Sequence, residues 1–478
     1  MAHRPSATET VTSKASNGSS AEYRSVSGRV ELFTPDQRRD KGRAQRVAVP
    51  RQAHEIFQKS AYRPDPVDTL VQQGESRLQH LLPIRYGRMM ASPFAFFRGS
   101  AAIMAWDLGH ATSTNLVAQL CGDAHLSNFG FFGSPERVLM FDMNDFDETI
   151  PGPFEWDVKR LAASAVLAGR SNGLSDPNCR DIARSCVYQY RKKLIEFSEM
   201  TTLEVWYSHV TAESLLDFIP NARRRKDVLA KIQKARGKDS LYAAAKLTDA
   251  AHGDLRIVER PPLIVRLPED EVGAVIQPVF AKYMQTLTDD RRALLDRYRY
   301  IDSAIRVGGV GSVGTRCYIV VLAGKDSSDP LVLQLKEAGS SVLSQYVRLN
   351  PYKNEGERVV QGQRLIQAVS DPFLGWVRHT TGRDLYVRQL FNMKASADLA
   401  SMKASLFATY AGVCGEILAR AHARSGDALQ IAAYLGKNEE FDQAVARFAM
   451  SYADQAEADH KALVEAAKSG KIEAELGV

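Results

Sequence analysis

The sequence predicts an α+β fold in which a large helical part carries a smaller, strand-rich unit. Apolar residues recur at three- and four-residue spacings over residues 51–108 and again from Trp156, which is the period of a helix with one buried face. β-Branched and aromatic residues concentrate between Ile305 and Leu335, as in strands. The last third is rich in Ala, Leu, Glu and Lys, which predicts further helices.

The charge distribution argues against a specific nucleic-acid-binding protein. The 478 residues carry a formal net charge of +6, but residues 1–51 hold 10 Lys and Arg against 5 Asp and Glu, so the remaining chain is nearly neutral. We expect residues 1–51 to form a disordered basic tail. No apolar stretch is long enough to span a membrane. The first 30 residues contain no apolar run, so we expect no secretory signal there. Five cysteines without a CxxC pair favour reduced thiols, and we expect a cytoplasmic protein.

The elements after the tail follow in a clear order. Helices run to about Leu108, and a strand over 116–120 leads into Cys-Gly-Asp. A second strand over 138–141 ends in an acidic cluster, and a long helix begins near Trp156. Residues 223–238 form a basic helix candidate, either a solvated face or a patch facing phosphate or substrate.

The most informative segment is Cys121-Gly-Asp-Ala-His-Leu-Ser-Asn128. A strand delivers Asp123, and Asn128 follows five residues later, which is the spacing of a kinase catalytic loop. In phosphoryl transfer a carboxylate accepts the proton of the attacking hydroxyl, while an amide on the same loop holds magnesium. Asp145 follows the next strand and is a candidate second metal ligand, because a hard cation needs oxygen ligands from several segments. His125, within the loop, is either structural or a phosphate contact.

A second constellation lies about 180 residues later. The segment Gly309-Val-Gly-Ser-Val-Gly314 matches both a dinucleotide motif and a kinase glycine loop. The residues after Gly314 are typical of a strand, whereas a dinucleotide site requires a helix there. We therefore expect a glycine-rich hairpin whose amides at Gly309, Gly311 and Gly314 can lie over phosphates.

The strand Leu331–Lys336 comes directly after this hairpin. Alternation places its three leucines on one face and Val332, Gln334 and Lys336 on the other. Lys336 is a candidate phosphate-binding lysine, or else an edge lysine with its ammonium in water. Glu355 and Glu357 begin the next helix, and either can orient Lys336; we favour Glu357.

Three arginines upstream of the loop, Arg85, Arg88 and Arg98, lie among apolar residues. They can bind an anionic substrate, although buried salt bridges to the acidic cluster are the preferred interpretation.

Two resemblances follow from these motifs. GDAHLSNFG, DFDE and PGPFEWDVKRLA over residues 122–162 resemble the catalytic core of the aminoglycoside phosphotransferases, a branch of the protein-kinase-like fold. Over most of its length, including PIRYGRMMASPFAFFRG, GVGSVGTRCY, GERVVQGQRLIQAVSDPFLGW, YVRQL and ARAHARSGD, the chain is similar to the bacterial domain of unknown function 2252 family. The first resemblance implies that Asp123 is the catalytic base, Asn128 and Asp145 are metal ligands, and Asp157 braces the catalytic loop.

The order of the motifs departs from that of a kinase, because the glycine segment and Lys336 follow the catalytic loop. We interpret this as a circular permutation of a two-lobed, protein-kinase-like fold. The expected parts are a helical catalytic lobe over 52–300, a β-rich nucleotide-binding lobe over 301–394 and a helical completion of the catalytic lobe over 395–478. Residues 384–394 would form the hinge strand, and the helix ending at His422 would pack beneath the catalytic loop.

The expected activity is ATP- and Mg²⁺-dependent phosphoryl transfer to a hydroxyl of a small-molecule acceptor. Nucleotidyl transfer on the same fold and a non-catalytic nucleotide-binding pseudokinase or scaffold are the alternatives. The sequence leaves the acceptor and the oligomeric state open.

Overall fold

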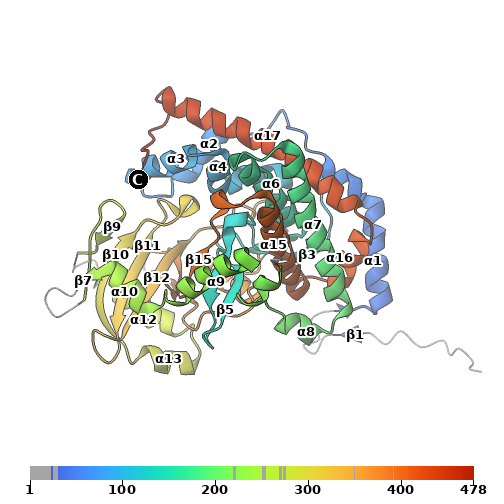
Figure 1. The fold of residues 1–478 in the computed structure, drawn as a ribbon. Coiled ribbons are helices and arrows are strands. Elements are labelled where there is room, and N and C mark those ends of the chain that lie inside the picture. The colour runs from blue at the N-terminus through green and yellow to red at the C-terminus, as the bar shows by residue number, and fades with distance from the viewer. Residues whose placement is uncertain are drawn as a thin grey trace, which may run out of the picture.

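The structure is a computed structural model with two parts, a six-stranded sheet with covering helices and a larger bundle of helices (Figure 1). It describes residues 23–24, 31–218, 222–249, 255–268, 272, 276–348, 350–379, 381–390 and 392–477. The predicted α+β class is confirmed.

The sheet part is antiparallel throughout, with the strand order β13-β14-β12-β11-β10-β9. Its strands are β9 (Ile264–Arg266), β10 (Arg299–Arg306), β11 (Cys317–Ala323), β12 (Pro330–Ala338), β13 (Gly375–Arg378) and β14 (Asp384–Gln389). Helix α14 (Glu355–Ile366) connects β12 to β13.

Helices cover both faces of this sheet. The leucines at 331, 333 and 335 of β12 pack in one apolar cluster with α12 (Gln277–Met284) and α13 (Asp289–Leu295), while Val332 packs with α10 (Ser240–Leu247). The alternation predicted for this strand is therefore confirmed. Because β9, α10, α12 and α13 belong to the sheet part, the predicted boundary at residue 301 was placed too late.

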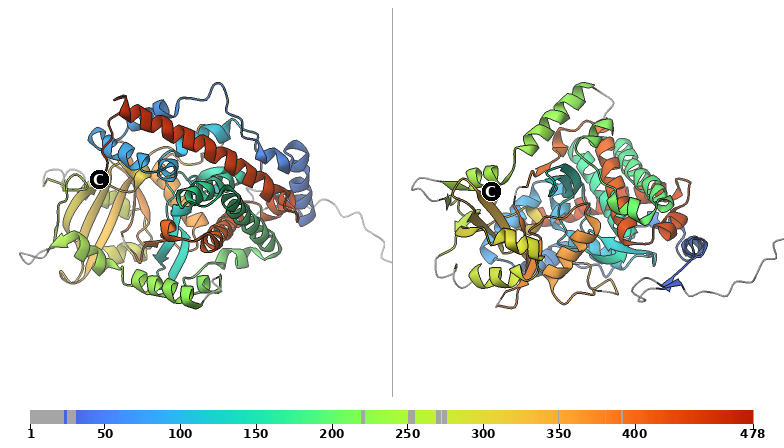
Figure 2. Two further views of the ribbon diagram at one scale, coloured as in Figure 1. Left: turned by 45° about the horizontal axis from the view of Figure 1, so that its top comes forward. Right: turned by 90° about the horizontal axis from the view of Figure 1, so that it is seen from below.

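The helical part is built around four long helices whose buried faces share one core: α6 (Glu155–Ser171), α7 (Asp176–Glu199), α15 (Ala404–Ser425) and α17 (Glu440–Lys468). Helix α17 runs across the bundle and also contacts the short N-terminal helices (Figure 2). These are α2 (Pro66–Gly74), α3 (Leu82–Met90), α4 (Pro93–Gly99) and α5 (Ala101–Gly109).

Short strands inside the helical part carry the polar loops. Strand β3 (Val117–Leu120) pairs with β6 (Ile150–Pro153), and β4 (Phe129–Gly133) pairs with β5 (Leu139–Met143) and with β15 (Ala395–Ser396). Both strands predicted to lead into polar loops are thus present. The other elements are β1 (Tyr23–Arg24), β2 (Glu31–Leu32), α8 (Thr202–Tyr207), α9 (Ala222–Arg236), β7 (Thr248–Asp249), β8 (Arg256–Ile257) and α16 (Ala428–Leu435).

The tail prediction needs correction. Residues 1–22 and 25–30 lie outside the described residues, but α1 (Pro35–Ala48) is a regular helix that packs on α16. Thr34 caps it, and Arg38 binds the carboxylate of Asp427 through two hydrogen bonds of 2.8 and 2.9 Å. A Cβ at Gly42 would lie 2.1 Å from the Gln430 carbonyl oxygen. The basic residues that suggested a solvated tail therefore include Arg38, which forms a tertiary ion pair.

No described helix is both long enough and apolar enough to cross a membrane.

Candidate active site

The first turn of α6 holds the loop between β3 and β4 in place through hydrogen bonds. The carboxylate of Asp157 is buried and accepts the backbone N–H groups of Cys121 at 2.7 Å and Gly122 at 3.0 Å. Gly122 has φ +83°, and a Cβ there would lie 2.1 Å from the Glu148 carbonyl oxygen. His422 of α15 lies 3.5 Å from the same carboxylate. Asp157 therefore has the bracing geometry that the resemblance implied, and α15 packs beneath the loop.

Asn128 joins the loop between β3 and β4 to the acidic loop that follows β5. Its Nδ2 donates to the carbonyl oxygens of Asp123 at 3.1 Å and Asp145 at 3.0 Å. Among the described residues, its Oδ1 accepts only a long hydrogen bond of 3.4 Å, from the Asn144 N–H. The amide is thus oriented by its nitrogen, which leaves its oxygen as a candidate metal ligand.

The side chain of Asp123 is paired with a cation from α6. Arg160 Nε donates to Asp123 Oδ1 at 2.6 Å, and the Arg160 side chain also donates to the Phe97 carbonyl oxygen and lies over the Phe97 ring. His125 Nε2 lies 3.7 Å from Asp123 Oδ2. Burial lowers the pKa of His125 to about 4, so the ring is neutral at pH 7, and its buried Nδ1 has no hydrogen-bond partner among the described residues.

Lys336 meets the acidic loop that follows β5. Its ammonium lies 4.0 Å from Asp145 and donates to Asp147, whose other oxygen accepts the Tyr386 hydroxyl at 2.8 Å. Burial opposes the charge on Lys336, but Asp145 and Asp147 raise its pKa well above the ordinary value.

Asp145 remains an anion over a wide pH range. Burial raises its pKa, yet Lys336, Arg388 and Lys394 outweigh this effect and lower it to about 2. The Asp145 side chain is still 48% exposed, whereas that of Lys336 is 4% exposed. Asp145 therefore offers a charged, accessible carboxylate beside a buried ammonium.

The glycine segment forms the turn between β10 and β11. A single 3₁₀ turn covers Val310–Ser312, and a strand, not a helix, follows Gly314. This placement contradicts the dinucleotide-fold alternative. Arg77 Nη1 donates to the carbonyl oxygens of Gly311 and Val313, which ties the turn to the helical part.

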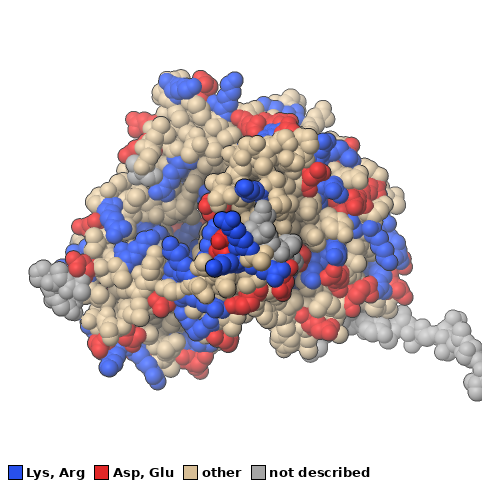
Figure 3. Space-filling view, viewed as in Figure 1, with Lys and Arg blue, Asp and Glu red and all other residues tan. Residues whose placement is uncertain are grey.

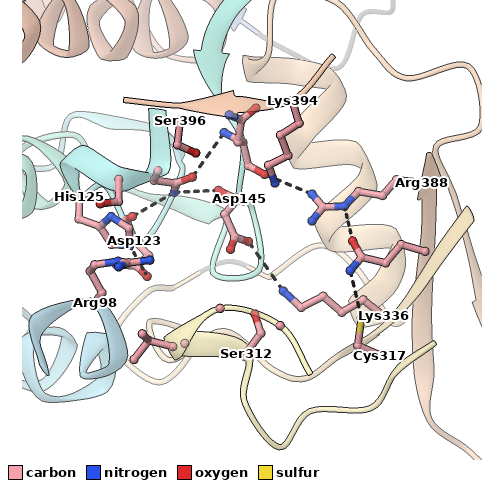
Figure 4. A pocket seen from close by; sticks show the side chains of 18 of the residues that line it. Arg98, Asp123, His125, Asp145, Ser312, Cys317, Lys336, Arg388, Lys394 and Ser396 are labelled. Atoms are coloured by element: carbon pink, nitrogen blue, oxygen red, sulfur yellow. Dashed lines mark hydrogen bonds and ion pairs between the residues drawn. The ribbon is translucent and has the colours of Figure 1, made fainter. Parts of the chain in front are cut away.

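These segments line one pocket of about 320 Å³ (Figure 4). Asp123, Asn128, Asp145 and Lys336 all line it, although they come from both parts of the fold. Of the glycines, Gly309 and Gly311 line the pocket, whereas Gly314, with φ +86°, packs against Arg77 instead.

The pocket carries an excess of positive charge. Lys and Arg side chains gather around a hollow between the sheet and helical parts (Figure 3). Against the carboxylates of Asp123 and Asp145, the lining cations are Arg98, Arg306, Lys336, Arg388 and Lys394. This arrangement suits an anionic ligand that brings its own cation.

Arg98 is poised toward such a ligand. It lines the pocket beside the carboxylates, and its buried Nε has no hydrogen-bond partner among the described residues. Lys394 lies across the pocket and is still exposed, and partial desolvation together with the neighbouring Arg388 lowers its pKa.

Comparison with known proteins gives one match. The model of a family described as an uncharacterized protein conserved in bacteria (DUF2252) matches residues 77–466. The chain belongs to this family. Neither the search of curated proteins nor that of solved structures finds a match. All the pocket residues named above lie inside the DUF2252 match.

One site prediction for this DUF2252 chain is wrong. Neither glutamate at the start of α14 orients Lys336, which instead pairs with Asp145 and Asp147. Glu355 pairs with Arg358 of its own helix, and Glu357 does not line the pocket. Arg358 reaches the acidic loop, where it donates to the carbonyl oxygens of Asp147 and Thr149.

Of the arginines before the Cys121–Asn128 loop, Arg85 and Arg98 differ from the preferred interpretation as partners of the acidic cluster. Arg85 is buried and donates to the Gly99 carbonyl oxygen, and Arg88 donates to that of Gly308, which lines the pocket. Among the ion pairs within 4.0 Å that the described residues form with one another, none involves Arg85 or Arg98. Arg88 thus holds the pocket wall at Gly308, while Arg98 lines the pocket itself.

Sequence reasoning missed Asp147, Arg160, Arg388 and Lys394. Asp147 lies in the acidic cluster that was recognised, but nothing in the spacing distinguishes it from Asp145. Arg160 lies three residues after Asp157, one helical turn away on the face that meets the loop, and that spacing was the available signal. In the described chain, no group of three or more His, Cys, Asp or Glu side chains is arranged to hold a metal ion.

Proposed function

We propose that this protein is an ATP- and Mg²⁺-dependent phosphotransferase that acts on a hydroxyl group of a small-molecule acceptor. The observation that carries the proposal is that Asp123, Asn128 and Asp145 share one cation-rich pocket with Lys336 and the glycine segment. Each of these groups has a separate role in phosphoryl transfer. Because they lie far apart in the sequence, their convergence in one pocket argues against coincidence.

The arrangement of elements supports a permuted, protein-kinase-like fold. A glycine turn is followed in the sheet part by β11, by β12 with Lys336 two residues before its end, by helix α14 and by two more strands. This is the order of the nucleotide-binding elements of a kinase. The chain then passes from β14 in the sheet to β15, which pairs with β4 beside the catalytic loop. This passage is where a hinge between two lobes would lie.

The chain's own residues define how the reaction would proceed. Lys336, Arg98 and the amides of the glycine segment would bind the phosphates. Asn128 Oδ1 and the Asp145 carboxylate fit a magnesium ion that enters with the nucleotide, because phosphate and water oxygens would complete its ligands. Bound there, magnesium would neutralise charge that develops on the phosphates.

Asp123 would accept the proton of the acceptor hydroxyl. As the hydroxyl oxygen bonds to the γ-phosphorus, the bond to the bridging oxygen breaks and ADP leaves with that electron pair. Arg160 holds the carboxylate toward the pocket at 2.6 Å, so the base is oriented before the substrates bind.

The same ion pair favours a second candidate, a nucleotide-binding protein without turnover. The Arg160 guanidinium donates to Asp123 Oδ1 and so occupies one of the two oxygens with which the base would accept the proton. In that case the pocket would bind Mg-ATP and signal its presence to a partner.

Turnover by an Asp123→Asn variant separates the two candidates. Asparagine keeps the size of the side chain but cannot accept the proton, so phosphoryl transfer should fall by roughly 100- to 10,000-fold with nearly unchanged Mg-ATP affinity. The wild type would first be screened with ATP against pooled metabolites, and the nucleotide product identified. ADP supports phosphoryl transfer, AMP or pyrophosphate would indicate nucleotidyl transfer, and tight binding without any product would support the non-catalytic candidate.

A further inference from the structure

A second pocket adjoins the candidate active site. It has a volume of about 140 Å³ and shares Ser396 with the cation-rich pocket. Ser396 belongs to β15, which pairs with β4 at Gly130, two residues beyond Asn128. In Figure 4, Ser396 lies across the cation-rich pocket from Ser312 of the glycine segment. The second pocket therefore opens along the strand that leaves the catalytic loop.

Its chemistry is opposite to that of its neighbour. Phe131 and Phe141 line it together with Leu215, Met402 and Val413. The charged lining residues, Lys231 and Asp398, are both exposed and lie at its rim. We call this space the apolar pocket.

Tyr410 links the apolar pocket to the catalytic loop. Its ring lines the pocket, and its hydroxyl donates to the carbonyl oxygens of Leu126 at 2.8 Å and Phe129 at 3.2 Å. An occupant in contact with Tyr410 would thus lie against the side chain that fixes the loop between Asp123 and β4.

We propose, on the basis of the proposed function, that the apolar pocket binds the non-reacting end of the acceptor. The substrate class would be a hydroxyl compound with an aromatic ring or a short alkyl chain. A dry cavity of about 150 Å³ holds benzene, so a volume of 140 Å³ matches one ring. Burial of that end would orient the hydroxyl toward Asp123 past Ser396, and it would disfavour polyols, which lose hydration there without compensation.

Helix α9 supplies a matched pair of variants for the test. Val228 lines the apolar pocket, whereas the neighbouring Leu229 is 39% exposed and does not. Val228→Trp would fill the pocket, and Leu229→Trp is the control on the same helix. Thr409→Phe fills the pocket from α15 and serves if Val228→Trp does not fold.

The probe is 2-phenylethanol, whose binding would be followed by saturation-transfer NMR without nucleotide. We expect a wild-type Kd on the order of 1 mM, at least fivefold weaker binding in Val228→Trp and Thr409→Phe, and no change in Leu229→Trp. Equal binding in all four proteins, or none in the wild type, would overturn the inference.

Two further measurements keep this inference distinct from the proposed function. Calorimetry should give the same Mg-ATP affinity in all four proteins, because none of the three residues lines the cation-rich pocket. Transfer from ATP to myo-inositol but not to 2-phenylethanol would overturn the acceptor class and leave the proposed function standing. Failure of the wild type to bind Mg-ATP would overturn the proposed function, and the acceptor assignment with it.

Discussion

Asp157→Asn tests how the loop from Cys121 to Asn128 is held in place. The Asp157 carboxylate is 1% exposed, and its two oxygens accept the N–H groups of Cys121 and Gly122. Hydrogen bonds to a charged group contribute about 1.5–3 kcal/mol each. Asparagine keeps one acceptor oxygen, but the bond to it becomes neutral, and its NH₂ faces the second N–H. We therefore expect the free energy of unfolding to fall by about 2–4 kcal/mol.

Urea unfolding followed by circular dichroism measures this loss. The control is Asp181→Asn on α7, where the carboxylate is 72% exposed and 3.9 Å from Arg184. That variant should change the free energy by no more than about 0.5 kcal/mol. A loss below about 1 kcal/mol for Asp157→Asn would show that the carboxylate does not hold the loop.

Two further predictions concern the acidic loop. Asp145→Asn should weaken Mg-ATP binding by about 10- to 100-fold in calorimetry, since one charge-assisted contact is lost. It should change the free energy of unfolding by less than about 1 kcal/mol, because the carboxylate is half exposed. Unchanged Mg-ATP affinity would make Asp145 a structural residue. Burial raises the pKa of Glu148 from 4.5 to about 7, outweighing the hydrogen bond from the Val342 N–H. Between these pH values the folded protein binds more protons than the unfolded chain, so this group's contribution to stability decreases as the pH rises. Glu148→Gln should flatten that part of the stability profile, and an unaltered slope would contradict the assignment.

Local patterns predicted much of the site. Alternation in residues 331–336 identified the face of Lys336, since a strand has a fixed period of two. Turn chemistry and the following β-branched residues predicted the glycine hairpin. The loop from Cys121 to Asn128 was recognisable as a candidate site because Asp123 and Asn128 lie five residues apart.

Features that depend on tertiary contacts were not predictable. The partner of Lys336 could be Asp145, Asp147 or a glutamate of α14, and only packing of the sheet part on the acidic loop selects among them. The ion pair of Arg38 with Asp427 joins residues 389 positions apart. Local sequence therefore predicts a solvated arginine in the N-terminal segment. The apolar pocket likewise combines Phe131 of β4, Val228 of α9 and Thr409 of α15, and no sequence pattern marks these three residues as neighbours.

The most direct test of the central claim is an experimental structure with a non-hydrolysable ATP analogue and Mg²⁺. We expect the phosphates between Lys336 and the Gly309–Gly311 turn, with the metal ion on Asn128 Oδ1 and Asp145. An analogue bound elsewhere, or a cation-rich pocket that stays without nucleotide at saturating concentration, would contradict the account.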